Sequence, residues 1–353
     1  LAFLNEARIS AEITHPNIVP VYEISLTKDK RPYYTMKYIE GRDLGQILGD
    51  LSQGNAAATQ KYSLKILLDI FVKLCDAIAF AHSKGIVHLD LKPENILFSE
   101  YGQVQVCDWG LAQRLSESEQ RSTHIKGTPG FLSPEQILQQ PPQPSCDIYA
   151  LGAILYSILT YQVPFNKMAL EEVMKATLEG NMQISSYTRR ILKIPTSLEA
   201  ICLKAVARQP DKRYASVMEL LKDIEAYQND RVTKAEKPVL MKYLWLFLKR
   251  NPLLSLAAFI FVFSIAILSL VFSAKINEAE LQKKVLAEKS APHFFLAAKK
   301  QYELNKFADA LKSITKALEY RPKEESYHLL KAEICVINLE LEMAQKHYKL
   351  SAG

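Results

Sequence analysis

The sequence predicts an α+β domain with a small sheet and a larger helical part, then one transmembrane helix, then an all-α segment. Three observations support this prediction. In residues 1–230, strand-like stretches come before helix-like ones, which is typical of α+β domains. Residues 253–272 form an uncharged run of 20 positions, enough for a helix to cross a bilayer. Residues 291–353 partly repeat themselves after 34 positions, as helical repeats do.

Composition limits the class of protein. The chain has 353 residues, 48% of them hydrophobic and 23% charged, which is ordinary for a protein with a folded core. It begins with Leu1 rather than Met, so we expect a fragment or a processed product. The net charge of +6 is spread along the chain instead of forming a basic tract, so no nucleic-acid partner is expected. The five cysteines form no CxxC pair, which fits free thiols in a reducing compartment.

The N-terminal elements follow from apolar spacing and turn residues. Residues 1–14 have the pattern of an amphipathic helix, and Pro16 stops it. Two β-rich stretches, 17–25 and 32–40, flank a turn-like TKDKR and predict an antiparallel pair. Gly41 then opens a helical region.

Helical spacing predicts the next long element. Residues 63–84 carry apolar side chains on one helical face, at Leu67, Ile70, Phe71, Leu74, Ile78 and Ala81. His82, near the end of this helix, is expected to be an ordinary helix residue. After Gly85 the pattern predicts short strands and then a mainly helical region, at 86–88, 96–98, 104–107 and 133–228.

The uncharged run has the flanks of a membrane span. Lys249 and Arg250 precede it, Lys275 follows it, and Trp245 lies just upstream, where an interfacial aromatic residue is expected. Residues 232–252 hold five Lys or Arg and residues 273–292 hold four, which leans slightly toward a cytoplasmic N-terminal side. We therefore divide the chain into a folded domain, a juxtamembrane segment, a transmembrane helix, a helical stalk and repeats, at 1–230, 231–252, 253–272, 273–290 and 291–353.

The C-terminal repeat matches small residues with small and large with large. The matched pairs are Ala298 with Ala332, Phe307 with Leu341, Ala310 with Ala344, and Ile314 with Tyr348. One expected pair fails, because Leu304 matches Asn338. The pattern resembles tetratricopeptide repeats, which implies protein partners bound through this segment. An unrelated helical hairpin is the alternative.

One short stretch concentrates polar residues among apolar ones. Residues 86–98 read IVHLDLKPENILF, and D-W-G follows at 108–110. Two Asp and one Asn supply oxygen ligands of the kind that Mg²⁺ prefers. Asp90 would accept a hydroxyl proton, Lys92 would offset charge on a transferred phosphoryl group, and Asn95 and Asp108 would hold metal.

These motifs resemble the catalytic loop and the metal-binding motif of eukaryotic-like protein kinases. Further matches in the same order are FLNEARISAEITHPNIV, MKYIEGRDL, GTPGFLSPE, DIYALGAILY and DKRY. The resemblance covers residues 1–230 and implies a kinase fold with a mainly helical C-lobe. It also implies ATP and Mg²⁺ as cofactors and protein Ser or Thr hydroxyls as substrates, because Lys92 and Thr128 fit the Ser/Thr class. The order of kinase, span and repeats resembles bacterial transmembrane Ser/Thr kinases.

The resemblance assigns a role to each matched residue. Asp90 and Lys92 would be catalytic, and Asn95 and Asp108 would bind metal. The nucleotide would be contacted from the C-helix, the hinge region and the floor of the site, by Glu6, Met36, Lys37, Tyr38, Ile39, Asp43 and Leu97. Structural or activation-segment roles would belong to His88, Thr128, Glu135, Asp147 and Arg213, with Arg213 pairing with Glu135. His88 is expected to pack and to hydrogen-bond rather than to act as a base.

The sequence departs from the family pattern in three places. It starts at the C-helix, so the Gly-rich loop and the strand-3 Lys are absent, and truncation is the expected reason. We expect the 353-residue piece to be nearly inactive alone, which full-rate phosphoryl transfer by it would refute. Leu89 replaces a phosphate-binding Arg, so activity is expected not to need phosphate on the activation segment, at Ser116, Ser118, Ser122 or Thr123. Trp109 replaces Phe, a tolerable aromatic exchange.

Two functions remain open. The first is an ATP-dependent Ser/Thr kinase at the cytoplasmic face of a membrane, with the repeats on the opposite side of a single span. The alternative is a catalytically dead pseudokinase whose lobe and repeats form a membrane scaffold. The retained set of Asp90, Lys92, Asn95 and Asp108 favours the enzyme, because a scaffold has no physical need for metal ligands.

Overall fold

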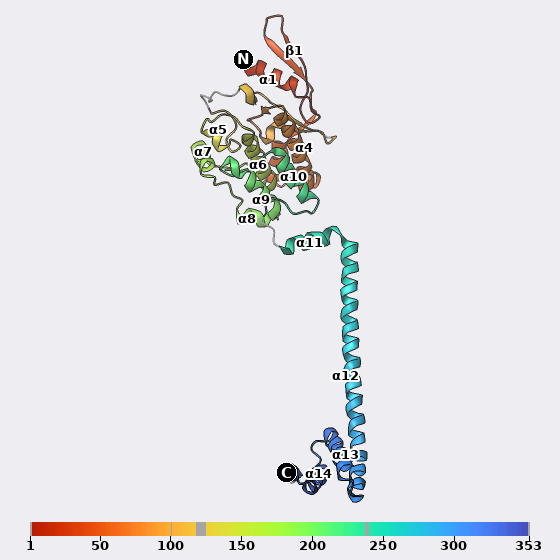
Figure 1. The fold of residues 1–353 in the computed structure, drawn as a ribbon. Helices are drawn as coiled ribbons and strands as arrows, with labels where there is room; N and C mark the ends of the chain where they lie inside the picture. Colours follow the sequence, from red (N-terminus) through yellow and green to blue (C-terminus); the bar gives the residue numbers. More distant parts are fainter. Residues whose placement is uncertain (1, 100, 118–124, 237–239, 352–353) are drawn as a thin grey trace. The chain divides into compact units, whose positions relative to one another are not determined.

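The computed structural model describes residues 2–99, 101–117, 125–236 and 240–351. The chain divides into two compact units, Leu1–Asn251 and Pro252–Gly353 (Figure 1). The first unit contains all the strands of the described residues and one large apolar core. The second unit is helical and has a smaller core of its own.

The first unit begins with a helix and a hairpin. Helix α1 is Ala2–Glu12, as the amphipathic pattern predicted. Strands β1, Val21–Leu26, and β2, Pro32–Met36, pair antiparallel, with Ile24 opposite Tyr34, as the sequence predicted (Figure 1). Thr27 and Arg31 close the turn through a 2.8 Å backbone hydrogen bond.

Short strands then frame the polar stretch. Strands β3, β5 and β6 form an antiparallel sheet, and β4 pairs with β7; their bounds are Gly41–Asp43, Ile96–Ser99, Val104–Val106, Ile86–Val87 and Gln113–Arg114. The polar stretch therefore leaves β4 and enters β5. The prediction that Gly41 opens a helical region is wrong by three residues. Gly41 lies in β3 because its backbone approaches Phe98 so closely that a side chain would meet the Phe98 carbonyl.

Two helices form the centre of the first unit. Helix α4, Leu64–Ser83, buries the six apolar residues whose spacing predicted it. Helix α6, Pro144–Thr160, is buried on nearly every side and packs against α4 and α9. The other helices of this unit are α2 Leu44–Ser52, α3 Ala56–Lys61, α5 Pro134–Ile137, α7 Leu170–Glu179, α8 Ser186–Ile191, α9 Thr196–Ala205, α10 Val217–Gln228 and α11 Leu240–Arg250. Short 3₁₀ turns lie at Pro93–Asn95, Leu115–Glu117 and Pro210–Lys212.

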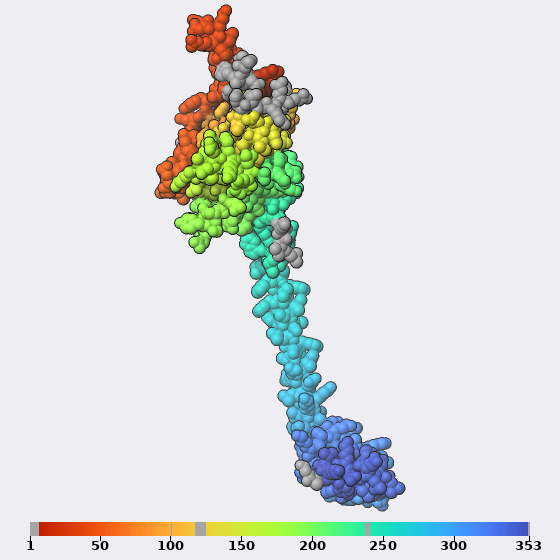
Figure 2. Space-filling view, turned by 90° about the vertical axis from the view of Figure 1, so that its left-hand side faces the viewer, coloured from red at the N-terminus to blue at the C-terminus, as the bar shows by residue number. Residues whose placement is uncertain are grey.

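The second unit starts with one very long helix. Helix α12, Pro252–Glu303, has 52 residues and runs unbroken through the predicted span, the predicted stalk and the start of the repeats. In the described part of the chain, it is the one helix long and apolar enough to cross a membrane. Its apolar stretch is exposed throughout, and Figure 2 shows this bare length in cyan.

The end of the second unit is a stack of helices. Helices α13 Phe307–Tyr320, α14 Glu325–Ile337 and α15 Leu341–Ser351 follow α12, and each packs on the one before it. The four alanines of the sequence repeat, Ala298, Ala310, Ala332 and Ala344, are all buried, so neighbouring helices approach closely. The two copies differ at one matched pair, because Tyr348 is 41% exposed where Ile314 is fully buried.

Candidate active site

Residues 88–95, which the sequence predicts to be the catalytic loop, are held at their start by Asp147. This carboxylate is fully buried near the beginning of α6. Its oxygens accept hydrogen bonds from the backbone N–H groups of His88, at 2.8 Å, and Leu89, at 2.9 Å. Leu89 has a φ of 66°, uncommon for a residue with a side chain. The two bonds offset the cost of burying the carboxylate and fix this unusual turn.

A third donor to Asp147 is His82, whose Nε2 lies 2.7 Å from Oδ2. Burial acts to raise the pKa of Asp147, but the contact and charge of His82, together with His88, outweigh it. The pKa of Asp147 is therefore below its ordinary value of 3.8, and the carboxylate stays ionised. The expectation that His82 is an ordinary helix residue is wrong. Its position, four residues after Ile78 on the buried face of α4, was the available signal.

Asp90, which the sequence predicts to be catalytic, has a carboxylate held by two neighbouring side chains. Its Oδ1 accepts a hydrogen bond from Thr128 Oγ at 2.9 Å, and its Oδ2 accepts one from Lys92 Nζ at 3.2 Å. Thr128 lies 38 positions away in the sequence, so the fold brings two separate motifs together here. Because both oxygens are engaged, the carboxylate has one fixed orientation. Three residues that the sequence singled out thus form one contact group.

Asn95 and Asp108 are the two residues that the sequence predicts to bind metal. The Asn95 amide donates to the Asp90 backbone carbonyl at 2.9 Å, which leaves the amide oxygen as an acceptor. Asp108 follows β6, is exposed, and has a φ of 60°. The Cys107 N–H donates to the Asn95 carbonyl at 3.0 Å and so places the two motifs side by side.

These donors fit Mg²⁺ that arrives with a nucleotide. Mg²⁺ is usually held by one or two carboxylates together with substrate phosphates and water. In the part of the chain that the structure describes, no group of three or more His, Cys, Asp or Glu forms a metal cage. Asn95 and Asp108 would therefore hold the ion jointly with the phosphates.

His88 links the two halves of the site. It is fully buried, with Nδ1 3.3 Å from the Asp90 N–H and Nε2 3.3 Å from the Cys107 carbonyl. Burial lowers the pKa of His88 below 6.5, and the nearby charges of Asp147, Asp90 and Asp108 only partly oppose this. Both ring nitrogens make hydrogen bonds within the site, as expected for a residue that packs and hydrogen-bonds. That His88 does not act as a base stays a prediction.

The segment after the catalytic loop is anchored by a buried ion pair. Arg213 donates to both oxygens of Glu135, at 2.6 and 2.9 Å, and also to the backbone carbonyls of Ser145 and Ala207. Burial acts to raise the pKa of Glu135, but the hydrogen bonds and charge of Arg213 lower it by more. The pKa of Glu135 is therefore below its ordinary value of 4.5. The pairing expected from the sequence is present. It fixes the start of α5, 78 positions from Arg213.

The residues predicted to contact the nucleotide lie on the sheet side of the site. Met36 ends β2, and Lys37, Tyr38 and Ile39 connect it to β3; Met36 and Tyr38 are exposed. Asp43 lies opposite Leu97 in the β3–β5 register, and its carboxylate caps α2 by accepting from the Gln46 N–H at 2.8 Å. Glu6 lies in α1, but its side chain is outside the described residues. The nucleotide roles of these positions stay predictions.

Leu89 and Trp109, the two residues that depart from the family pattern, both make contacts inside the domain. The Leu89 carbonyl accepts from Gln136 Nε2 at 2.9 Å, a contact that no local sequence pattern indicates. Trp109 is buried against His88, with ring centroids 4.5 Å apart. Its indole N–H has no hydrogen-bond partner among the described residues, a cost that Phe would not carry. Ser116 is exposed, whereas Ser118, Ser122 and Thr123 lie outside the described residues.

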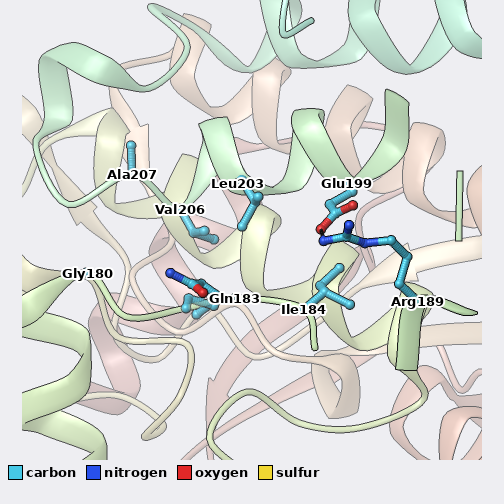
Figure 3. Close-up of a pocket in the computed structure, with 9 residues that line it drawn as sticks. Gly180, Gln183, Ile184, Arg189, Glu199, Leu203, Val206 and Ala207 are labelled. Atoms are coloured by element: carbon cyan, nitrogen blue, oxygen red, sulfur yellow. Dashed lines mark hydrogen bonds and ion pairs between the residues drawn. The ribbon is translucent and has the colours of Figure 1, made fainter. Parts of the chain in front are cut away.

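A separate hollow of about 290 Å³ lies between the stretch after α7 and helix α9. Figure 3 shows Arg189 and Glu199 at one side of it, with the guanidinium facing the carboxylate. Because these two charges pair with each other, they stabilise the packing of α8 on α9. The hollow shares no lining residue with the catalytic loop.

The fold and this site define a domain of the protein-kinase class, and comparison with known proteins agrees. The family model described as protein kinase domain matches residues 2–225. The chain therefore belongs to the protein kinase family.

Similar curated proteins carry the name serine/threonine-protein kinase PknD. The one from Protochlamydia amoebophila (strain UWE25) is 36% identical over 251 residues, covering 65% of this chain and 26% of that protein. The one from Chlamydia pneumoniae is 38% identical over 250 residues, covering 64% and 26%. The one from Chlamydia felis (strain Fe/C-56) is 36% identical over 249 residues, with the same coverage. The chain thus spans about a quarter of the length of these relatives.

Proposed function

We propose that this protein is a Ser/Thr protein kinase that transfers the γ-phosphoryl group of ATP to protein hydroxyls. One observation carries the proposal: a single carboxylate, Asp90, is held between Thr128 and Lys92, and its backbone carbonyl accepts from the Asn95 amide. The Asn95 carbonyl in turn accepts from the N–H of Cys107, the residue before Asp108. The similar PknD proteins are named as serine/threonine-protein kinases, which supports the same substrate class.

The proposed mechanism assigns one task to each group. Asp90 positions the acceptor hydroxyl and accepts its proton, while Thr128 keeps the carboxylate turned toward the substrate. Lys92, 3.2 Å from Asp90, lies where it can offset negative charge on the transferred phosphoryl group. Asn95 and Asp108 would hold Mg²⁺, which neutralises phosphate charge when bound. The protein supplies mainly position and electrostatics, as this reaction requires.

We further propose that the protein is anchored in a membrane by the first part of α12. This helix is apolar, exposed and long enough to cross a bilayer. Because ATP is the substrate, the kinase domain belongs on the cytoplasmic side, and a single span places the C-terminal helices on the other. Their buried alanines and repeat spacing favour tetratricopeptide-like hairpins that bind protein partners.

The test of the enzyme is phosphoryl transfer by a chain that carries a Gly-rich loop and a strand-3 Lys ahead of residue 1, because the 353 residues alone are expected to be nearly inactive. The assay uses Mg·ATP and a generic basic protein substrate. Asp90→Asn should lower the rate by at least about 10²-fold, because it removes the proton acceptor and keeps the size of the side chain. Acid hydrolysis of the product should yield phosphoserine or phosphothreonine.

The matched control is Asp29→Asn, an exposed residue in the turn between β1 and β2, which should leave the rate unchanged. A wild-type protein that binds Mg·ATP but transfers nothing would support the pseudokinase scaffold instead. A product phosphorylated on tyrosine would refute the substrate class.

A further inference from the structure

Helix α11 joins the kinase domain to α12, and polar contacts hold one of its sides against the domain. Lys242 donates to Ser197 at the beginning of α9 at 3.1 Å and also pairs with Glu236. Lys249 pairs with Asp230 at 2.6 Å, just after α10. Both lysines and Leu246 lie on the same helical face, at i, i+4 and i+7.

This attachment leaves much of α11 without close packing. A hollow of about 920 Å³ lies beside it, lined by α11 and by the starts of α4 and α9. Among the described residues of α11, Leu246 is the buried one, with 9% of its surface exposed. Contact with the domain therefore accounts for little of the apolar surface of this helix.

The opposite side of α11 is apolar and faces solvent. Met241, Leu244, Phe247 and Leu248 form this face, and between 42% and 72% of each is exposed. Trp245, which is 59% exposed, lies at its edge, because it also lines the hollow and its ring centroid lies 5.6 Å from Lys249 Nζ. An eleven-residue helix with such a face and with basic residues beside it has the composition of helices that lie in membrane interfaces. Trp245 is suited to that depth, because its ring is apolar and its N–H is polar.

The chain itself indicates the partner of this face. Helix α11 ends at Arg250, and the apolar helix α12 begins at Pro252. Asn251 closes α11 through a 3.0 Å bond to the Phe247 carbonyl, and Pro252 suits the first position of a new helix. A bilayer crossed by α12 would thus begin within a few residues of α11. Because α11 directly precedes the helix proposed to cross the membrane, the bilayer is the partner that the chain itself brings to this face.

We propose that α11 lies in the lipid–water interface, with Met241, Leu244, Phe247 and Leu248 buried among the acyl chains and Trp245 at the edge of this face, and that Lys242 and Lys249 fasten the kinase domain to it. The inference rests on the proposed membrane span. It gives α11 the role of an interfacial anchor that keeps the α9 side of the domain next to the bilayer, rather than leaving the domain on a free tether.

The test uses tryptophan fluorescence of the full chain in nanodiscs of phosphatidylcholine, with or without bromine atoms near the glycerol end of the acyl chains. The chain contains two tryptophans, and Trp109 is buried in the kinase core. A Trp245 ring in the interface lies within quenching distance of the bromine atoms. If brominated lipid halves the Trp245 signal and leaves the Trp109 signal unchanged, total emission should fall by about a quarter. Trp245→Phe should abolish this fall.

Two further variants sharpen the test. Met241→Glu combined with Leu244→Glu puts charges into the apolar face and should remove the quenching. The matched control, Leu138→Glu, changes an exposed leucine at the end of α5 and should leave the quenching unchanged.

An alkaline carbonate wash separates this proposal from the one it depends on. If the chain leaves the lipid, the span is wrong and the anchor falls with it. If the chain stays and Trp245 is not quenched, or if Trp245→Phe keeps the quenching, the interfacial placement alone is wrong.

Discussion

Leu89 shows how single residues set the catalytic loop. Its N–H donates to Asp147 and its carbonyl accepts from Gln136, so both backbone groups have partners inside the domain. The loop is therefore held by fixed internal contacts. This supports the hypothesis that the site does not require a phosphate to order it, as a domain with Arg at this position would.

The buried ion pair between Glu135 and Arg213 gives a prediction at the same scale. Arg213→Met should lower the free energy of unfolding by about 3–5 kcal/mol at neutral pH, because it leaves a buried carboxylate without its partner. Arg213→Lys should lower the free energy of unfolding by less, because lysine keeps the positive charge. It still loses the bidentate hydrogen bond to the carboxylate. Urea denaturation of the kinase domain in the full-length protein measures both.

The pH dependence of this pair follows from the lowered pKa of Glu135. The unfolded chain binds a proton near pH 4.5, and the folded pair binds one only at lower pH. The pair therefore stabilises the fold above pH 4.5, and this contribution is lost as the pH falls through the folded pKa. The difference between wild type and Arg213→Met should shrink as the pH falls. A constant difference down to pH 3 would contradict the assignment.

At the scale of elements, the long helices were predictable and the short strands only approximately so. The spacing from Leu67 to Ala81 specified α4, because one buried face determines the whole helix. Strand β3 was missed because three residues carry no periodicity, and only the closeness of Gly41 to Phe98 makes them a strand. The contacts from His82 to Asp147 and from Gln136 to Leu89 join positions far apart in sequence, so spacing alone did not reveal them.

Two helical glycines give a prediction about packing between elements. Gly152 in α6 lies against α9, where an added methyl group would come within 2.7 Å of Ala205 and Val206. Gly152→Ala should destabilise the kinase domain by about 1–3 kcal/mol through overpacking. Gly49 in α2 has no neighbour in the corresponding space, so Gly49→Ala should stabilise the domain by about 0.5–1 kcal/mol through helix propensity. Equal effects of the two changes in thermal unfolding would contradict this packing.

At the scale of the whole molecule, the chain consists of two units with separate cores. The sequence predicted an α+β unit, an apolar helix and a helical end. The predicted boundaries between span, stalk and repeats leave no break in the structure, because α12 continues through all of them. Along α12 the residues change from apolar to charged, but the helical hydrogen bonding continues without a break. The change in composition therefore did not mark a structural boundary.

Separate cores predict separate stabilities. Ala298 is fully buried where α12 meets α13, whereas the adjacent Ala297 is exposed. Ala298→Leu should destabilise the C-terminal helices by about 1–3 kcal/mol, since the larger side chain has no space. Ala297→Leu should have almost no effect. Hydrogen exchange resolved by segment should show the change in α12 to α15 alone, and loosening of α4 or α6 would contradict the independence of the units.

The proposed kinase activity requires that Asp108 and Asn95 hold the metal of a nucleotide while Asp90 serves the incoming hydroxyl. The most direct measurement is electron paramagnetic resonance of Mn²⁺ bound to the full-length protein with a non-hydrolysable ATP analogue. We predict that Asp108→Asn weakens Mn²⁺ binding at least about tenfold, because a carboxylate ligand is lost. Asp90→Asn should bind Mn²⁺ nearly as wild type does. Unchanged binding in Asp108→Asn would contradict the account.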